Sequence, residues 1–477
     1  MTDRLTAWLI GSGSLLQTCH DVLVRRGHRV TAVISADEPT LRWASQQDVP
    51  CARRLDAVAA EAPDHLFSLA NPAILTPGEL RIPRRFAVNS HYGPLPAYAG
   101  LNAQHWAIMR GERTYGISWH VMSPGIDDGD LLLQRSFDIP AGATTLDLNV
   151  RCLRESVESF PSLVDKVADG HAGTPQDRSA RSYFSRATPL PRAGVLDWAV
   201  PAEPTARQCR AGQTGPFDNT FGVLRWVTEH AVALVRAATA LPGADGPPGT
   251  LVLDDDRAPR LTTTDGVLTV TRMSTVDGQD LVPGPWLREQ GFRSGTVTPR
   301  HDDLAPVEAL AARSLAHEGF WLRQLGHRPA TLPIPEDAAA GELTLAESVP
   351  ASRWPAALAE LTGRPVTTAW QLPDLPPLGP GLAALFAASA PITVEPGQDP
   401  AHGEAEILRR GTYLRDIVAR HPHRELASAA CPVSIGTTHL PARQLSIRAG
   451  ADGAVQLRSP VWTTRTLTWL ARQVGTP

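Results

Sequence analysis

Three polar residues on two loops have the types and the spacing that acyl transfer to an amine requires. Asn89 and His91 end the apolar run that begins at Phe86, and residues two apart in an extended strand point to the same side. Asp127 lies further on, in the acidic turn 125–130 between two apolar runs. Because open α/β sheets bind ligands at the carboxyl ends of their strands, we expect the amide, the imidazole and the carboxylate to meet there.

The chemistry of these groups fits a tetrahedral intermediate. Asn89 can donate its amide N–H to a developing oxyanion, a contact worth about 3–4 kcal/mol when it is preorganised. His91 can share that oxyanion and move a proton from the amine to the leaving nitrogen. We expect Asp127 to orient the imidazole and to favour its protonated form. The attacking amine is itself the nucleophile, so the reaction requires no covalent intermediate on the protein.

Neither the acidic turn nor the cysteines predict a metal site. Asp127, Asp128 and Asp130 offer too few ligands for a calcium loop. The five cysteines are far apart and form no C-x-x-C pair, which argues against both a zinc ribbon and a disulfide framework.

Elements that alternate between strand and helix must position the candidate residues. Apolar runs at 5–10, 30–34, 66–69 and 86–89 predict strands, and 14–26 and 40–47 predict helices between them. The segments 116–122 and 131–137 predict two more strands, which the acidic turn joins, and 145–167 predicts a long helix. This order predicts an α/β domain with a mostly parallel sheet. Gly11 and Gly13 match only part of a dinucleotide fingerprint, because Leu16 replaces the third glycine; a tight turn into a helix is the better interpretation.

Composition gives no sign of a nucleic-acid partner, a lipid partner or a membrane span. At 477 residues the chain is long enough for two to four domains, and its net charge of −4 gives no reason to expect nucleic acid or anionic lipid as a partner. No apolar run approaches the ~18–20 residues of a membrane span. The apolar start of the chain is too short for a signal peptide, so we expect a cytoplasmic protein.

The motifs around the three residues resemble those of a known family, the N10-formyltetrahydrofolate-dependent formyltransferases. The likeness covers residues 1 to about 235. It is nearest to the formylation domains that begin some nonribosomal peptide synthetases. The matching pieces are Asn89–His91, Leu95–Pro96, Gly100 and Ile126–Asp130, together with His91–Gly100, Gly116–Met122 and Arg181–Arg186 in the wording of that branch.

The resemblance implies an N-formyltransferase with N10-formyltetrahydrofolate as its co-substrate. It implies catalytic roles for Asn89, His91 and Asp127, and structural roles for Asp128 and Asp130. It also implies that the segment 67–75 cradles the pterin, with Asn71 and Ile74 as contacts. His120 matches no catalytic position of the family, and we expect it to pack on its strand.

Three domains follow from the resemblance. Residues 1–177 would form a Rossmann-like catalytic domain with a mostly parallel sheet, and 178–298 a small OB-like β-barrel. Residues 299–477 resemble half of a condensation domain with an α+β fold, on the segments Glu318–Leu325, Pro329–Pro335, Leu445–Gly453 and Trp462–Val474. The motif His-His-x-x-x-Asp-Gly is missing from this region, which we therefore expect to be inactive in condensation. Its apolar positions, Trp321, Trp354, Trp370 and Trp469 among them, predict a buried core.

The acceptor amine stays open at this point. The synthetase-like wording favours an amino acid, either bound to a carrier protein or free, such as a siderophore hydroxyornithine. A nucleotide amino sugar, and water in a 10-formyltetrahydrofolate hydrolase, are alternatives, and so is a docking scaffold in a synthetase pathway. Methionyl-tRNA is disfavoured, because the chain is acidic and residues 189–194 form no basic patch.

Overall fold

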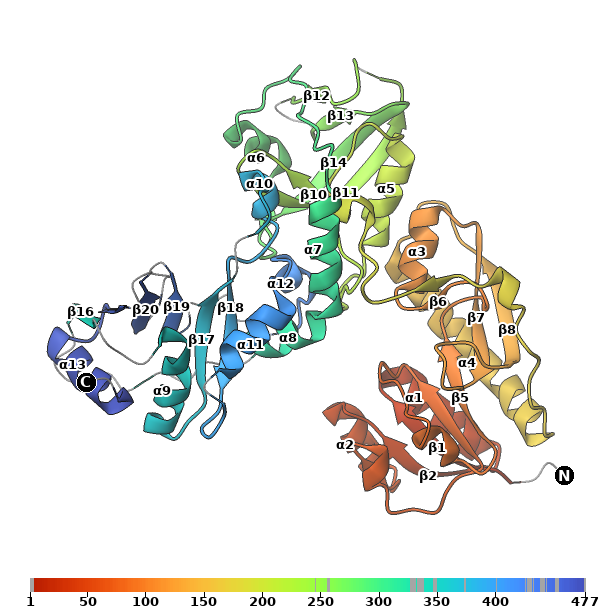
Figure 1. The fold of residues 1–477 in the computed structure, drawn as a ribbon. Helices are drawn as coiled ribbons and strands as arrows, with labels where there is room; N and C mark the ends of the chain where they lie inside the picture. The colour runs from red at the N-terminus through yellow and green to blue at the C-terminus, as the bar shows by residue number, and fades with distance from the viewer. Residues whose placement is uncertain are drawn as a thin grey trace. The chain divides into compact units, whose positions relative to one another are not determined.

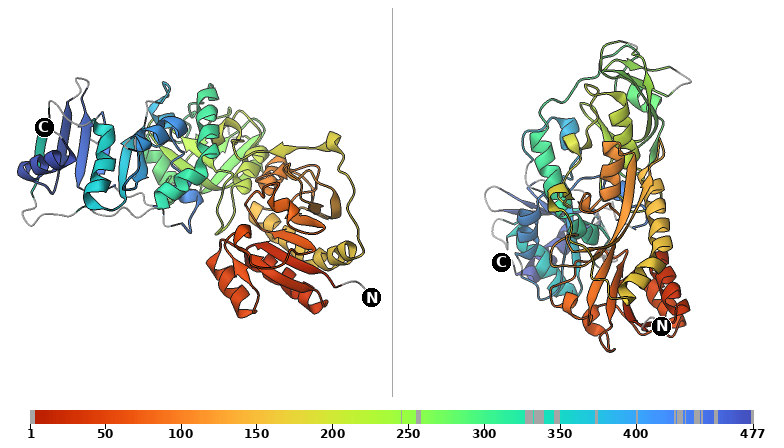
Figure 2. Two further views of the ribbon diagram at one scale, coloured as in Figure 1. Left: turned by 60° about the horizontal axis from the view of Figure 1, so that its bottom comes forward. Right: turned by 90° about the vertical axis from the view of Figure 1, so that its right-hand side faces the viewer.

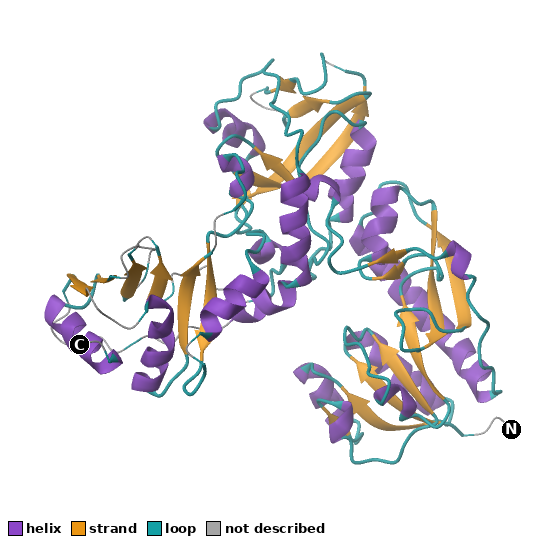
Figure 3. Ribbon diagram, viewed as in Figure 1, coloured by secondary structure: helices purple, strands orange, loops and turns teal. Residues whose placement is uncertain are grey.

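The computed structural model forms two compact units, residues 1–186 with 210–215 and residues 187–209 with 216–477, and each is described by itself (Figure 1). The structure describes residues 4–244, 246–254, 258–326, 332, 339–345, 350–372, 375–399, 401–424, 426, 431, 433–437, 442, 444–450 and 454–475. Figure 3 shows that both units mix helices and strands.

The first unit is built on a seven-stranded sheet with the order β3-β2-β1-β4-β5-β7-β8. Figure 2 shows this unit, coloured red to yellow, from two further sides. The strands from β3 to β5 are parallel, whereas β7 is antiparallel to both β5 and β8. A mostly parallel α/β sheet is therefore confirmed. Its strands are β1 (Thr6–Gly11), β2 (Arg29–Ile34), β3 (Cys51–Ala52), β4 (His65–Leu69), β5 (Phe86–His91), β7 (Thr114–Val121) and β8 (Leu131–Asp138).

Four helices flank this sheet: α1 (Gly13–Arg25), α2 (Glu38–Gln46), α3 (Ala103–Arg110) and α4 (Thr145–Ala168). The start of α4 is set by a capping box, in which Thr144 and Asp147 each bond the other's backbone N–H. Short 3₁₀ turns lie at Leu55–Ala57, Glu79–Arg81 and Arg178–Ala180. At Gly11 a Cβ atom would lie 1.7 Å from the Leu69 carbonyl oxygen, so this glycine allows the close approach of two backbones.

A short two-stranded sheet follows α4 in the first unit. β9 (Tyr183–Phe184) pairs in parallel with β6 (Ala99–Gly100), which lies just after β5. The end of the first unit thereby pairs with the loop that follows β5.

The second unit begins with an antiparallel sheet of order β10-β11-β14-β13-β12, with β15 paired to β14. The pairings of the described residues do not join β10 to β12, and an OB-like barrel stays a prediction. The elements are a 3₁₀ turn (Pro191–Gly194), α5 (Ala202–Ala211), β10 (Leu224–Val227), β11 (Val232–Pro242), β12 (Leu251–Val252), β13 (Arg260–Thr262), β14 (Gly266–Ser274), β15 (Asp280–Leu281) and α6 (Pro283–Glu289).

The rest of the second unit is a mixed sheet of order β16-β21-β20-β19-β17-β18 with helices. Its elements are α7 (Ala305–Ala316), α8 (Glu318–Gly326), β16 (Gly341–Leu345), a 3₁₀ turn (Ala351–Arg353), α9 (Trp354–Thr362), β17 (Val366–Gln371), α10 (Pro380–Ala383), β18 (Ser389–Val394), α11 (His402–Arg410), α12 (Ile417–Arg420), β19 (Val433–Gly436), β20 (Leu445–Ala449), β21 (Val455–Ser459) and α13 (Thr464–Val474). The likeness to half a condensation domain stays a prediction. Parts of two of its segments lie outside the described residues: all of Pro329–Pro335 except Leu332, and positions 451–453 of Leu445–Gly453.

Most of the apolar positions expected in this region are buried. Trp321, Trp354 and Trp370 belong to one core cluster. The expectation for Trp469 is wrong, because this side chain is 55% exposed. The opposite face of α13, with Leu467 and Leu470, is the face that packs inward.

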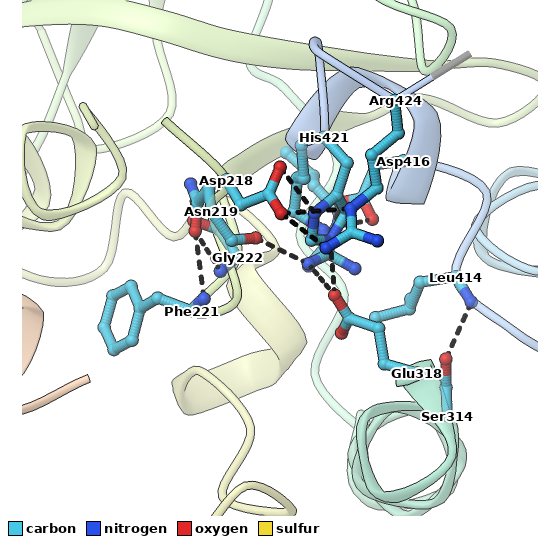
Figure 4. Close-up of polar contacts among 12 residues, drawn as sticks. Asp218, Asn219, Phe221, Gly222, Ser314, Glu318, Leu414, Asp416, His421 and Arg424 are labelled. Atoms are coloured by element: carbon cyan, nitrogen blue, oxygen red, sulfur yellow. Dashed lines mark hydrogen bonds and ion pairs between the residues drawn. The ribbon is translucent and has the colours of Figure 1, made fainter. Parts of the chain in front are cut away.

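A buried cluster of charges joins β10 to helices α8 and α12 in the second unit; Figure 4 labels Glu318, Asp416 and His421 among its members. Arg225 on β10 donates to Asp416 at 2.9 Å, and Arg420 donates to the other oxygen of Asp416 at 3.0 Å. Arg420 also contacts Glu318 at 2.8 Å, and His421 contacts Glu318 at 2.7 Å. These five side chains, named here the charge cluster, are all at most 5% exposed. The charge cluster thus packs α8 and α12 against β10.

Candidate active site

The central strand β5 carries two of the three predicted residues to the end of the parallel sheet. Asn89 and His91 lie two apart at its carboxyl end, as alternation on a strand requires. β5 is antiparallel to β7, and the register places Asn89 opposite His120 and His91 opposite Ser118. The polar face of β5 therefore continues onto its neighbour.

Asp127 reaches the same point from the turn between β7 and β8. Its Oδ2 atom lies 3.4 Å from Nδ1 of His91, and its Oδ1 atom lies 3.4 Å from Nε2 of His120. The backbone N–H of Gly100 donates to Oδ2 at 2.9 Å. The structure brings the predicted imidazole and carboxylate together, although β6, α3 and β7 separate them in sequence.

The imidazole of His91 is oriented by a backbone carbonyl. Its Nε2 atom lies 2.8 Å from the carbonyl oxygen of Tyr98, which only accepts, so Nε2 carries the proton and donates. Nδ1, on the side of Asp127, is then the atom free to take a second proton.

The pKa of His91 reflects opposing effects. Burial lowers the pKa of His91, and the charges of His120 and Arg181 lower it further, whereas Asp127 and the Tyr98 carbonyl act in the opposite direction. Asp127 thus favours the cation, as expected, but the desolvation of the buried ring outweighs it and leaves the pKa of His91 below its ordinary value. The lowered pKa favours the neutral ring near pH 7.

Asp127 is ionised in this site. Burial alone would raise its pKa, but the contacts with His120 and His91 and the N–H of Gly100 together hold the pKa of Asp127 well below its ordinary value. A fixed negative charge thus stands beside the atom of His91 that can accept a proton.

His120 belongs to the same polar group, and the expectation that it only packs on its strand is incomplete. It is 2% exposed, and its Nε2 atom lies 3.2 Å from the side-chain nitrogen of Asn89 as well as near Asp127. Its Nδ1 atom lies 2.9 Å from the Val121 carbonyl oxygen, which fixes Nδ1 as a donor. The signal for this role was the alternation of Ser118 and His120, although the register that sets it opposite Asn89 is not readable from one strand.

Asp128 and Asp130 make contacts that close the turn from within. The Asp128 carboxylate accepts a hydrogen bond from the hydroxyl of Ser123, and the main-chain carbonyl of Asp130 accepts from the N–H of Val121 at 2.8 Å. The structural roles expected for these two residues stay predictions.

The predicted folate contacts lie in the loop after β4. β4 neighbours β5 in parallel, so this loop leaves the same edge of the sheet. Asn71 closes the loop by two hydrogen bonds of 3.2 Å with the backbone of Ala73. Ile74 is 76% exposed. The exposed apolar side chain of Ile74 is available for contact with a flat ring. The roles of Asn71 and Ile74 stay predictions.

The described residues hold no group of three or more His, Cys, Asp and Glu side chains that could bind a metal ion. Nor does any described helix have the length and hydropathy of a membrane-spanning segment.

Comparison with known proteins places this geometry in a family. The family model described as "Formyl transferase" matches residues 23–164, which include Asn89, His91 and Asp127. The methionyl-tRNA formyltransferase of Granulibacter bethesdensis is 27% identical over 325 residues, covering 63% of this chain and 99% of that protein. That of Burkholderia pseudomallei is 30% identical over 249 residues, covering 52% of this chain and 74% of that protein. Among solved structures, an N-formyltransferase from Helicobacter canadensis matches with a TM-score of 0.44 and 16% identity, covering 55% of this chain and 98% of that one. The chain therefore belongs to the folate-dependent formyltransferase family.

Proposed function

We propose that this enzyme transfers the formyl group of N10-formyltetrahydrofolate to the amine of an amino acid, either free or bound to a carrier protein, in nonribosomal peptide or siderophore biosynthesis. The observation that carries the chemistry is the pairing of His91 with Asp127, in which Nδ1 of the buried ring lies 3.4 Å from a carboxylate oxygen. The choice of acceptor is supported by the resemblance of the catalytic segments to formylation domains of peptide synthetases.

The first step is attack of the amine nitrogen on the formyl carbon. A C–N bond forms, and the formyl oxygen becomes an oxyanion. Asn89 has two side-chain N–H groups, of which one faces His120, so the other can donate to that oxygen. A preorganised donor of this kind stabilises a transition state by about 3–4 kcal/mol.

The second step moves one proton. Nδ1 of the neutral His91 takes it from the attacking amine, while Nε2 stays bonded to the Tyr98 carbonyl. Asp127 stabilises the imidazolium that forms beside it. The proton then passes to N10 as the bond between N10 and the formyl carbon breaks, which releases tetrahydrofolate and the formylated amine. No group of the protein is consumed.

The pterin of the donor would lie against the loop after β4. We assign Asn71 to fixing the loop and Ile74 to apolar contact with the ring, on the basis of the bonds to Ala73 and of the exposure of Ile74. Both assignments rest on the resemblance as well as on these observations.

Methionyl-tRNA is the second candidate acceptor. It is favoured by one observation, the match to 99% of the length of a methionyl-tRNA formyltransferase. The acidic balance of the chain, with a net charge of −4, weighs against a polyanionic acceptor. A nucleotide amino sugar or water as acceptor, and a scaffold that docks a synthetase without turnover, are further alternatives.

A panel of acceptors separates these functions. The full chain would be given 10-formyltetrahydrofolate with free amino acids including hydroxyornithine, an aminoacyl carrier protein, methionyl-tRNA, a nucleotide amino sugar or buffer alone, and products would be read by mass spectrometry. We expect formylation of the amino acid, free or carrier-bound, with a kcat/KM at least about 100-fold above the other acceptors. Preferential formylation of methionyl-tRNA or of the sugar would overturn the proposed acceptor. Release of formate in buffer alone, as fast as formylation of any acceptor, would indicate a hydrolase. Binding of the carrier protein without turnover would indicate a scaffold.

A further inference from the structure

We propose that residues 176–184, named here the return segment, position the catalytic carboxylate and imidazole relative to each other. The segment lies beyond the residues 23–164 that the family model matches. The inference rests on the proposed roles of His91 and Asp127, and it adds Gln176 and Arg181 as positioning residues.

On one side, the return segment holds the backbone of the Asp127 turn. The side-chain nitrogen of Gln176 donates to the carbonyl of Asp127 at 3.0 Å and to that of Gly129 at 2.7 Å. The guanidinium of Arg181 donates to the carbonyls of Ile126 at 2.6 Å and Asp127 at 3.2 Å. Four hydrogen bonds from two side chains thus converge on one short turn.

This turn needs such support because Asp127 has a φ angle of 49°. A left-handed conformation is less favourable than the usual right-handed one for a residue with a Cβ atom. Without external bonds to its carbonyls, the turn would relax and the carboxylate would leave its position near His91. The bonds of Gln176 and Arg181 oppose that relaxation.

On the other side, the return segment holds the loop that orients His91. The hydroxyl of Ser182 accepts from the N–H of Tyr98 at 2.8 Å, and its carbonyl accepts from Ala99 at 2.9 Å. The carbonyl of Phe184 accepts from Leu101 at 2.9 Å. The Tyr98 carbonyl is therefore fixed at the point where it accepts from His91.

The two sides meet at Gly100. Its N–H points away from β9 and donates to Asp127, whereas its neighbours Ala99 and Leu101 donate to the return segment. One segment of chain therefore fixes the carbonyl that orients the imidazole, the turn that carries the carboxylate, and the amide that joins them. We infer that the separation of His91 and Asp127 is set by Gln176 and Arg181.

The test compares Gln176→Leu, Arg181→Lys and Arg181→Met in the full chain, with Arg178→Ala as a matched control. Arg178 is an exposed arginine of the same segment. Two signals would be followed by nuclear magnetic resonance without any acceptor or folate: the exchange rate of the Gly100 amide and the titration of the His91 ring. The Leu101 amide reports whether the pairing of β6 with β9 persists.

If the inference holds, Gln176→Leu and Arg181→Lys speed exchange at Gly100 at least about 10-fold while Leu101 stays protected, since only the bond to Asp127 is lost. The pKa of His91 falls in both, because Asp127 is the charged group that raises it. Simple loss of the Arg181 charge would instead raise the pKa of His91, because that charge lowers it. The Arg178→Ala control leaves both signals unchanged.

Gly100 exchange and a His91 titration like those of the original protein, in both Gln176→Leu and Arg181→Lys, would overturn the inference. Gln176→Leu and Arg181→Lys preserve size or charge, and they decide the question if Arg181→Met does not fold. Because neither signal depends on turnover, an error in the proposed acceptor would leave this test intact, whereas a failed inference would leave the acceptor panel intact.

Discussion

The site uses a histidine whose charge changes during the reaction and a carboxylate whose charge does not. Burial keeps His91 neutral at rest, which leaves Nδ1 able to accept a proton from the attacking amine. Asp127 stays ionised and stabilises the cation once it forms. The buried imidazolium therefore forms only during the proton-transfer step.

The pH dependence of turnover should follow the lowered pKa of His91. Since the neutral ring is the active form, kcat/KM should rise as pH rises through that pKa, below 6.5, and then stay level through neutral pH. Asp127→Asn removes a group that raises the pKa of His91, so the rising limb should move to lower pH while the plateau falls about 10-fold or more. Rate profiles of the two proteins measure both effects. An acid limb that stays in place in Asp127→Asn would contradict the pairing of these residues.

Loss of either catalytic residue on β5 should abolish most of the activity. We expect Asn89→Ala or His91→Ala to lower kcat about 100-fold or more, because an oxyanion donor or the proton carrier is lost. Thermal unfolding would check that the fold is kept, and Asn149→Ala on α4 would serve as a control. Near-normal rates in both variants would show that the site has been assigned wrongly.

At the scale of elements, the site depends on how closely the loops after β5 and β7 approach its side chains. A Cβ atom on Gly93 would lie 2.6 Å from Nε2 of His91 and 3.0 Å from the Tyr98 carbonyl oxygen. A Cβ atom on Gly129 would lie 2.0 Å from the Val121 carbonyl oxygen. These glycines let the two loops close around the imidazole and the carboxylate.

Gly93→Ala should therefore damage catalysis more than stability. The added methyl group must displace the His91 ring from its bond to Tyr98, and a shift of about 1 Å at a reacting group costs on the order of 100-fold in rate. The measurement is kcat together with the midpoint of thermal unfolding. Gly78→Ala is the matched control, because the atom nearest to its Cβ would be 3.8 Å away and its φ angle is −68°. Equal kcat in the two variants would contradict the argument.

At the scale of the whole molecule, one apolar cluster joins residues on either side of position 299. Leu304, Val307 and Leu315 pack in this cluster with Val195 and Val227, which precede residue 299. The charge cluster adds the buried pair of Arg225 and Asp416. The expected second and third domains thus share one apolar cluster, although each also has an apolar cluster of its own.

Cutting the chain near Arg300 should consequently unfold what remains of the second unit. Arg225, with a side chain 3% exposed, would lose Asp416, and an unpaired buried charge costs about 3–5 kcal/mol. The apolar cluster would also be opened to water. We expect residues 1–300 to be insoluble or to lose the second unfolding transition in calorimetry. A soluble, cooperatively folded product of this cut would contradict the shared core.

Asp416 should also make the second unit sensitive to acid. Burial acts to raise its pKa, but Arg225 and Arg420 lower the pKa of Asp416 to about 2. A depressed pKa contributes stability above the ordinary carboxyl value near 4, and that stability is lost as pH falls toward about 2. Asp416→Asn should lose about 3–5 kcal/mol of unfolding free energy at pH 7 and much of the acid dependence. Urea unfolding from pH 7 to 2 measures both, and Asp56→Asn, at the exposed pair with Arg54, is the control.

Much of the first unit could be predicted because its signals are local. Apolar runs and glycine turns gave the strands and helices around Asn89 and Asp127 to within a few residues, since periodicity and caps act over one or two turns of chain. The pairing of Asn89 with His91 follows from alternation on one strand. That Asp127 would meet them could be inferred because its turn follows a strand expected in the same sheet.

The sequence by itself therefore determined the family, the mostly parallel sheet and the three catalytic candidates. Only the tertiary structure decided the register that sets His120 opposite Asn89, the burial that lowers the pKa of His91, and the hydrogen bonds from Gln176 and Arg181 to the Asp127 turn. It also decided that Asp416 would neutralise Arg225, 191 residues away. The physical reason is common to all four: desolvation and hydrogen bonding depend on which groups meet in space, and local sequence patterns do not specify partners far along the chain.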